Sequence, residues 1–243
     1  MSAHLRKLKR GLSKQFDGMG VWKRKRDHSH DQLTPGIYAF IVSAVTAAGI
    51  LVTFLFVGLS SYWEPSPWGT MLLCVLMIVG GMFGSLIAIL SPKPGTSFTG
   101  FMIVAVSFGL PLGPLLAMYT DADIAHILGA TLLVVIALGT IGALVPKSLG
   151  GIGSLLISSI TILLVAYLAV PVSNLLGYAY PIPFSVLDWV GIILFSVLVI
   201  VDWNRAMRLA YTLDNAVDSA VAIYLDWFNI FIRLLSLNGQ RKN

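Results

Sequence analysis

Charged residues are scarce in this chain of 243 residues: they make up 11% of it, whereas 57% of the residues are hydrophobic and the mean hydropathy is +0.86. A soluble domain carries about 25% charged residues. A surface with half that fraction of charged residues does not keep a folded chain dispersed in water. Lipid must therefore be the solvent for most of the surface. The composition therefore excludes an ordinary soluble domain and predicts an integral membrane protein.

Cysteine and strand-like patterns are also lacking. Cys74 is the only cysteine, which excludes an intrachain disulfide and leaves no indication of the redox compartment. Alternation of polar and apolar residues with a period of two is absent from the sequence, which excludes an outer-membrane barrel. The remaining possibility is an all-α membrane protein.

Long apolar runs are what the sequence has instead. Crossing a hydrocarbon core of about 30 Å takes about 20 helical residues. Seven runs approach or exceed that length, and short connections rich in Pro, Gly and Ser separate them: residues 36–59, 68–90, 98–119, 126–145, 152–172, 185–201 and 220–237. They predict a seven-transmembrane-helix bundle. Two GxxxG pairs indicate close helix contacts: Gly80 with Gly84, and Gly109 with Gly113.

The predicted organisation has three parts. Residues 1–35 form a basic cytoplasmic tail, residues 36–237 the transmembrane helical bundle, and residues 238–243 a short C-terminal tail. Nine of the sixteen Lys and Arg residues fall in the first 26 positions, which favours an interaction with anionic lipid headgroups. No aromatic platform accompanies this basic run, so nucleic acid is not expected as a partner.

Charges in the loops predict the orientation. The basic loop residues fall on the same side as the basic tail: Lys93, Lys147, Arg205 and Arg208. The opposite loops hold acidic residues without any Lys or Arg: Glu64, Asp121, Asp123 and Asp188. The positive-inside rule therefore places the N-terminus in the cytoplasm. Seven crossings would leave the C-terminus outside although it ends in Arg241 and Lys242, so the last helix either crosses or enters and returns.

Charged residues within a membrane segment are costly and usually functional. Asp202 ends the sixth run, and Asp226 lies six residues into the seventh, about 9 Å deep. The two carboxylates are therefore expected at similar depths on neighbouring helices. Spacings of three and four place Asp226, Asn229 and Arg233 on one face of the last helix. A polar stripe of this kind points into the bundle, so the last helix is expected to be central.

Two interpretations of the aspartates remain open at this point. Paired in a low-dielectric site, they titrate as a unit: they share a hydrogen bond when protonated, and when deprotonated they repel and offer hard oxygen ligands for Ca²⁺. In the other interpretation, Asp202 sits at the interface and Asp226 pairs with Arg233. The other polar residues are expected at ordinary solvated positions: Asp188 and His126 at the outer interface, and Asp214 and Asp218 in a cytoplasmic loop.

The residues around both aspartates resemble the Bax inhibitor-1/YccA family, also called TMBIM. The stretch AVAIYLDWFNIF, residues 220–231, is similar to the terminal signature of that family. Residues 195–202, followed by Arg205, resemble its sixth helix, and residues 119–124 and 146–153 resemble its central loops. The similarity covers residues 36–237.

This resemblance implies a seven-helix bundle and a pH-sensitive Ca²⁺ leak gated by the aspartate pair, which maps onto Asp202 and Asp226. These two are also the expected Ca²⁺ ligands, and no cofactor is expected. Some family members have an arginine in the second helix that latches the pair, but residues 68–90 contain no charge. The candidate substitutes and gate partners are Arg205, Arg208, Asn229 and Arg233.

The resemblance also implies an alternative function. Bacterial relatives of the YccA type restrain the membrane protease FtsH through a cytoplasmic tail, so a regulator that binds a membrane protease or another membrane complex is the competing hypothesis. An intramembrane aspartyl protease is disfavoured because neither aspartate has a Tyr-Asp or Gly-x-Gly-Asp context. The protein is not expected to be an enzyme, and the predicted location is a bacterial plasma membrane.

Overall fold

The computed structural model describes residues 32–175 and 183–239. Most of the predicted basic tail and the last residues of the C-terminal tail lie outside the described residues. Seven long helices and one short 3-10 turn follow one another: α2 (Pro35–Ser60), α3 (Pro67–Leu90), α4 (Pro94–Leu116), α5 (Asp121–Leu144), η3 (Gly150–Ile152), α6 (Gly153–Leu175), α7 (Phe184–Ala206) and α8 (Leu213–Asn238). All seven long helices are long and apolar enough to cross a membrane. The predicted all-α fold with seven spans is confirmed.

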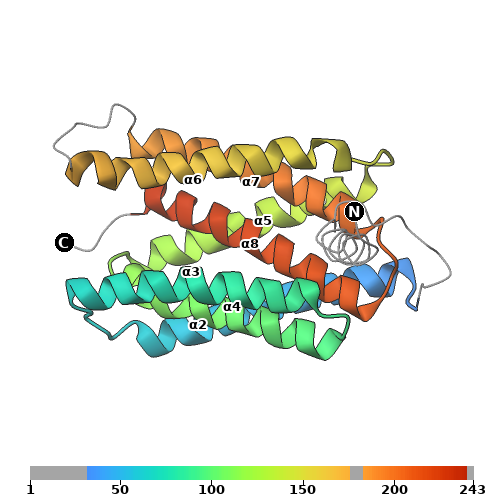
Figure 1. Ribbon diagram of the computed structural model, residues 1–243, viewed down its shortest axis with the longest axis horizontal. Helices are drawn as coiled ribbons and strands as arrows, with labels where there is room; N and C mark the ends of the chain where they lie inside the picture. Colours follow the sequence, from blue (N-terminus) through green and yellow to red (C-terminus); the bar gives the residue numbers. More distant parts are fainter. Residues whose placement is uncertain (1–31, 176–182, 240–243) are drawn as a thin grey trace, which may run out of the picture.

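Helix α8 is the central element of the bundle. Figure 1 shows it crossing the middle of the molecule, with α6 and α7 on one side and α2, α3 and α4 on the other. It packs against α2, α3, α4, α5 and α7. Its largest fully buried side chains include Trp227, Tyr224 and Phe231. The prediction that the last helix is central is therefore confirmed.

Helix starts follow from local sequence signals. The side chains of Thr34, Ser66, Thr120 and Thr212 accept hydrogen bonds from the first turns of α2, α3, α5 and α8. Such caps satisfy backbone N–H groups that have no partner within the helix. Proline stands at the first position of α2, α3 and α4, where its missing N–H costs nothing.

The start of α8 corrects a sequence prediction. The hydropathy pattern placed Asp214 and Asp218 in a loop, but α8 begins at Leu213 and both aspartates belong to it. Polar residues lower the hydropathy of these first turns, yet Asp214 and Ser219 form hydrogen bonds with other helices. Ser97 of α4 donates to Asp214 Oδ1 at 2.8 Å, and Tyr38 of α2 donates to the Asn215 carbonyl oxygen at 3.1 Å. Asp226 is consequently near the middle of its helix and not 9 Å from the start.

The end of α8 answers the question whether the last helix crosses or returns. At its start, the backbone N–H groups of Gln32 and Leu33 donate to the Tyr211 carbonyl oxygen, both at 3.0 Å, next to the first residues of α2. At its other end, Gly239 packs against the ring of Tyr119, just after α4 ends. The two ends of α8 therefore lie at opposite ends of the bundle, and the helix crosses it completely.

Two glycine pairs bring α2, α3 and α4 into close contact, as the GxxxG spacing predicted. A Cβ atom at Gly84 of α3 would lie 2.6 Å from the Gly100 carbonyl oxygen of α4, and one at Gly109 would lie 2.5 Å from the Thr53 carbonyl oxygen of α2. Only glycine permits such an approach of backbones. Helix α4 runs on through Pro111 and Pro114.

Candidate functional site

The carboxyl groups of Asp202 and Asp226 are in direct contact. Asp202 stands one turn before the end of α7, Asp226 in the middle of α8, and their side chains are 8% and 4% exposed. The two carboxyl groups are close enough to interact directly. A hydrogen bond between them requires a proton on one of the two, because ionised carboxylates only accept hydrogen bonds. Among the described residues, Asp202 Oδ1 and Asp226 Oδ2 have no hydrogen-bond donor of their own.

Helical spacing brings the polar residues of both helices to one cavity. It has a volume of about 680 Å³ and lies between α6, α7 and α8. The face that α8 turns to it carries Asp226, Asn229, Arg233 and Ser236. The facing side of α7 carries Asp188, Phe195, Leu198 and Asp202. These successive spacings of three, four and seven keep each set on one side of its helix, so the polar stripe predicted for α8 is present and faces inward.

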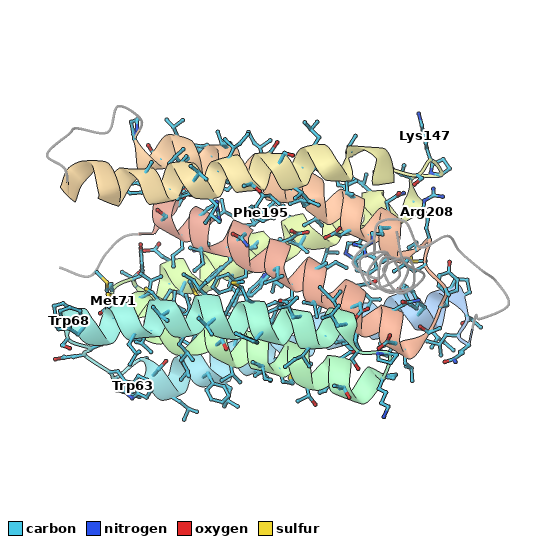
Figure 2. All side chains as sticks on the ribbon, viewed as in Figure 1. Trp63, Trp68, Met71, Lys147, Phe195 and Arg208 are labelled. Atoms are coloured by element: carbon cyan, nitrogen blue, oxygen red, sulfur yellow. The ribbon has the colours of Figure 1, made fainter. Side chains whose placement is uncertain are left out.

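The two ends of the bundle differ in charge. Figure 2 shows Lys147 and Arg208 at one end and Trp63 and Trp68 at the other. The first is called here the basic end and the second, with Glu64, the acidic end. The cavity extends from the aspartate pair toward the acidic end, where α7 begins and α8 finishes.

Asp188 corrects a second sequence prediction. It was expected at a solvated interface, but its side chain is 5% exposed and its two oxygens are bonded within the protein. The Tyr167 hydroxyl of α6 donates to Oδ1, and the Ser236 hydroxyl of α8 donates to Oδ2 at 2.8 Å. The aspartate is buried because α6 and α8 cover the first turn of α7.

Arg233 and Asn229 form a pair within α8. Arg233 Nη1 donates to Asn229 Oδ1 at 2.8 Å, and Asp188 is the acidic side chain that acts on the guanidinium. The alternative interpretation, in which Asp226 pairs with Arg233, is therefore not the arrangement found. Asp226 has its carboxyl partner in Asp202 instead.

The other two candidate gate partners lie at the basic end. Arg205, one turn after Asp202 in α7, acts electrostatically on that aspartate and shares a small cavity with it and Asp218. Arg208 instead donates to the carbonyl oxygens of Val145 and Pro146 in the connection between α5 and η3. Of the candidate arginines within the described residues, Arg205 is therefore the one beside the aspartate pair.

Asn204 is a buried residue that the sequence did not single out. Its Nδ2 donates to the carbonyl oxygens of Gly142, Val145 and Lys147 at 3.2, 2.9 and 3.2 Å, and its Oδ1 accepts from the Leu149 N–H at 2.9 Å. The side chain thus fastens the connection after α5 to the end of α7. A single polar residue at the end of an apolar run gives no sequence signal for this role.

The chain was compared with models of known protein families. A family model described as Bax1-I, inhibitor of apoptosis-promoting Bax1, matches residues 32–243 of this chain. The matched part contains all seven helices, both members of the aspartate pair and the cavity beside them.

Proposed function

Because the chain belongs to the Bax inhibitor-1 family of membrane proteins, we propose that it is a pH-sensitive Ca²⁺ leak channel with Asp202 and Asp226 as its gate. The observation that carries this proposal is the contact of two buried carboxyl groups at the head of a cavity between three membrane-spanning helices. A buried carboxyl pair has no evident packing role, because an apolar pair of similar size fills the same space without the cost of burying charge.

The gate works through the proton that the two carboxyls share. With the proton present, one hydrogen bond joins α7 to α8 and the pair carries a single charge. Without it, two negative charges repel each other in a medium that screens them weakly, so the helices separate at this point. The separated carboxylates then offer hard oxygen ligands to Ca²⁺. Ca²⁺ takes six to eight oxygen ligands, and two carboxylates supply only a few of them. Such a site binds the ion weakly, which suits its passage better than its retention.

A cation beside the pair sets how easily the proton leaves. Helix α3 has no charged residue in the part where some relatives carry a latching arginine. Arg205 is the arginine that acts on Asp202, from the same helix. We assign it the role of the gate's counter-charge in this chain.

The basic end is assigned to the cytoplasm, and the membrane to a bacterial plasma membrane. Lys147 and Arg208 lie at this end. At the acidic end, Glu64 precedes α3, and Asp121 and Asp123 stand in the first turn of α5. This charge difference agrees with the positive-inside rule, and it supports our assignment of the N-terminal tail to the cytoplasm.

A second function is supported by the composition of residues 1–26, which hold nine of the sixteen Lys and Arg residues. In this alternative, the chain regulates a membrane protease of the FtsH type or another membrane complex, and the tail binds the partner or anionic lipid. Deletion of residues 1–26 should leave a monodisperse bundle in detergent and weaken binding to vesicles that contain anionic lipid. Loss of the folded bundle would contradict the division into tail and bundle.

Reconstitution tests the leak directly. The purified chain in liposomes should release Ca²⁺ faster as the pH is raised across the range in which the pair loses its proton. Protein-free liposomes give the background at each pH. Release no faster than this background at any pH would rule out the leak and favour the regulatory function.

A further inference from the structure

The cavity contains a second polar cluster at its acidic end, which the gate does not use. This outer cluster consists of Tyr167 of α6, Asp188 of α7, and Arg233 and Ser236 of α8. Asp188 is fixed by two hydroxyl groups from two different helices. The cluster therefore joins all three helices that enclose the cavity.

Arg233 is held across the cavity by contacts that suit a guanidinium. Its Cζ atom lies 5.2 Å from the centre of the Tyr167 ring and 4.9 Å from the centre of the Phe195 ring, so it sits between side chains of α6 and α7. Its Nη1 donates to the Asn229 carbonyl oxygen at 3.1 Å and to Oδ1 at 2.8 Å. A guanidinium stacks on aromatic rings, which suits this place between the rings of Tyr167 and Phe195.

Gly191 makes room for this arrangement. It stands one turn after Asp188 in α7, and a Cβ atom at this position would collide with Nε and Cδ of Arg233. The side chain of Arg233 thus occupies a place that the facing helix leaves open. It lies about two turns of α8 beyond Asp226 on the way to the acidic end.

We infer that Arg233 is a fixed positive charge in the cation path, so that it limits the rate at which cations, and divalent cations most of all, pass between the aspartate pair and the acidic end. The inference deepens the proposed leak and rests on it for the identity of the permeant ion. A cation that leaves the pair along the cavity passes this guanidinium, which is partly buried between the rings of Tyr167 and Phe195. Repulsion there is strong, and it doubles with the charge of the ion. The Asp188 carboxylate offsets part of the positive charge of Arg233, and the Tyr167 hydroxyl interacts with both groups.

Ca²⁺ release from liposomes gives the first test. Arg233→Gln, which removes the charge and keeps an amide near Asn229, should raise the rate about tenfold or more at alkaline pH. Arg233→Lys, which keeps the charge, should stay within about threefold of the parent chain. Lys93→Gln removes an exposed positive charge away from the cavity and serves as the control. Equal rates for Arg233→Gln and the parent chain would overturn the inference.

A second test measures the effect of the Arg233 charge without Ca²⁺, from the rates of thiol modification by charged and uncharged reagents. Leu225 lines the cavity beside Asp226, on the far side of Arg233 from the acidic end. In a Cys74→Ala background, Leu225→Cys is exposed to a cationic and to a neutral thiol reagent of similar size, added at the acidic end of oriented vesicles. Loss of the Arg233 charge should raise the rate at which the cationic reagent modifies the cysteine about tenfold. The rate for the neutral reagent should change by less than about twofold.

The two readouts separate the failure of this inference from that of the leak. A parent chain that releases no Ca²⁺ contradicts the proposed function, while the ratio of the two reagent rates still tests the charge barrier. Equal increases for both reagents would mean that Arg233 only holds the helices together, and would overturn the inference. Arg233→Met, which keeps the length of the side chain without hydrogen-bonding groups, replaces Arg233→Gln if the latter does not fold.

Discussion

Asp202 and Asp226 face each other although Asp202 stands one turn from the end of α7 and Asp226 near the middle of α8. They meet because α7 packs directly against α8, whose first turns extend beyond this point and pack beside α2, where Tyr38 contacts Asn215 and Ser219. The pair is thereby buried below the basic end and opens toward the cavity. This position leaves the aspartate pair at one end of the cavity and the outer cluster at the other.

The first prediction concerns orientation. In a Cys74→Ala background, a cysteine at Tyr62 should react with a membrane-impermeant thiol reagent added outside intact cells, because this side chain is 89% exposed at the acidic end. A cysteine at Lys147, at the basic end, should react only after the membrane is opened. The reverse pattern of labelling would contradict the assignment of the basic end to the cytoplasm.

The second prediction concerns close helix packing. Gly84→Ala should lower the free energy of unfolding by about 1–3 kcal/mol, because its Cβ atom would lie 2.6 Å from a backbone oxygen of α4. Gly58→Ala is the matched control: it is also helical, but no atom lies within 4 Å of the added Cβ. This control should stabilise the protein by up to about 1 kcal/mol through helix propensity. Thermal unfolding in detergent measures both, and equal shifts would argue against contact between α3 and α4 at this glycine.

The third prediction concerns Asn204. Asn204→Ala should lower the free energy of unfolding by about 2 kcal/mol or more, because it leaves several buried backbone groups of the connection after α5 without partners. Asn238→Ala, which removes one bond from an exposed position to the Leu234 carbonyl oxygen, is the control and should have little effect. Proteolysis near residues 145–149 should accelerate in the first variant alone. Unchanged stability would mean that these bonds are not formed in the membrane protein.

Hydropathy and spacing were sufficient to predict the seven helices and the central place of α8. They placed Asp202 and Asp226 at similar depths on neighbouring helices but left open whether Asp226 pairs with Asp202 or with Arg233. They failed where polar residues are buried by partners distant in the sequence. Asp188 looked solvated because its two donors come from other helices, and Asp218 looked like part of a loop although it is buried within α8. Such satisfaction depends on tertiary contacts, which no local pattern encodes.

The most direct measurement is Ca²⁺ release against pH for Asp202→Asn, Asp226→Asn and the double variant, with melting temperature recorded beside it. Asparagine keeps most of the volume and hydrogen bonding but removes the titration. Each single variant should lose the rise of Ca²⁺ release with pH, and the double variant should add little further change, because the two residues act as one unit. An unchanged pH response in both single variants, at the melting temperature of the parent chain, would contradict the gate.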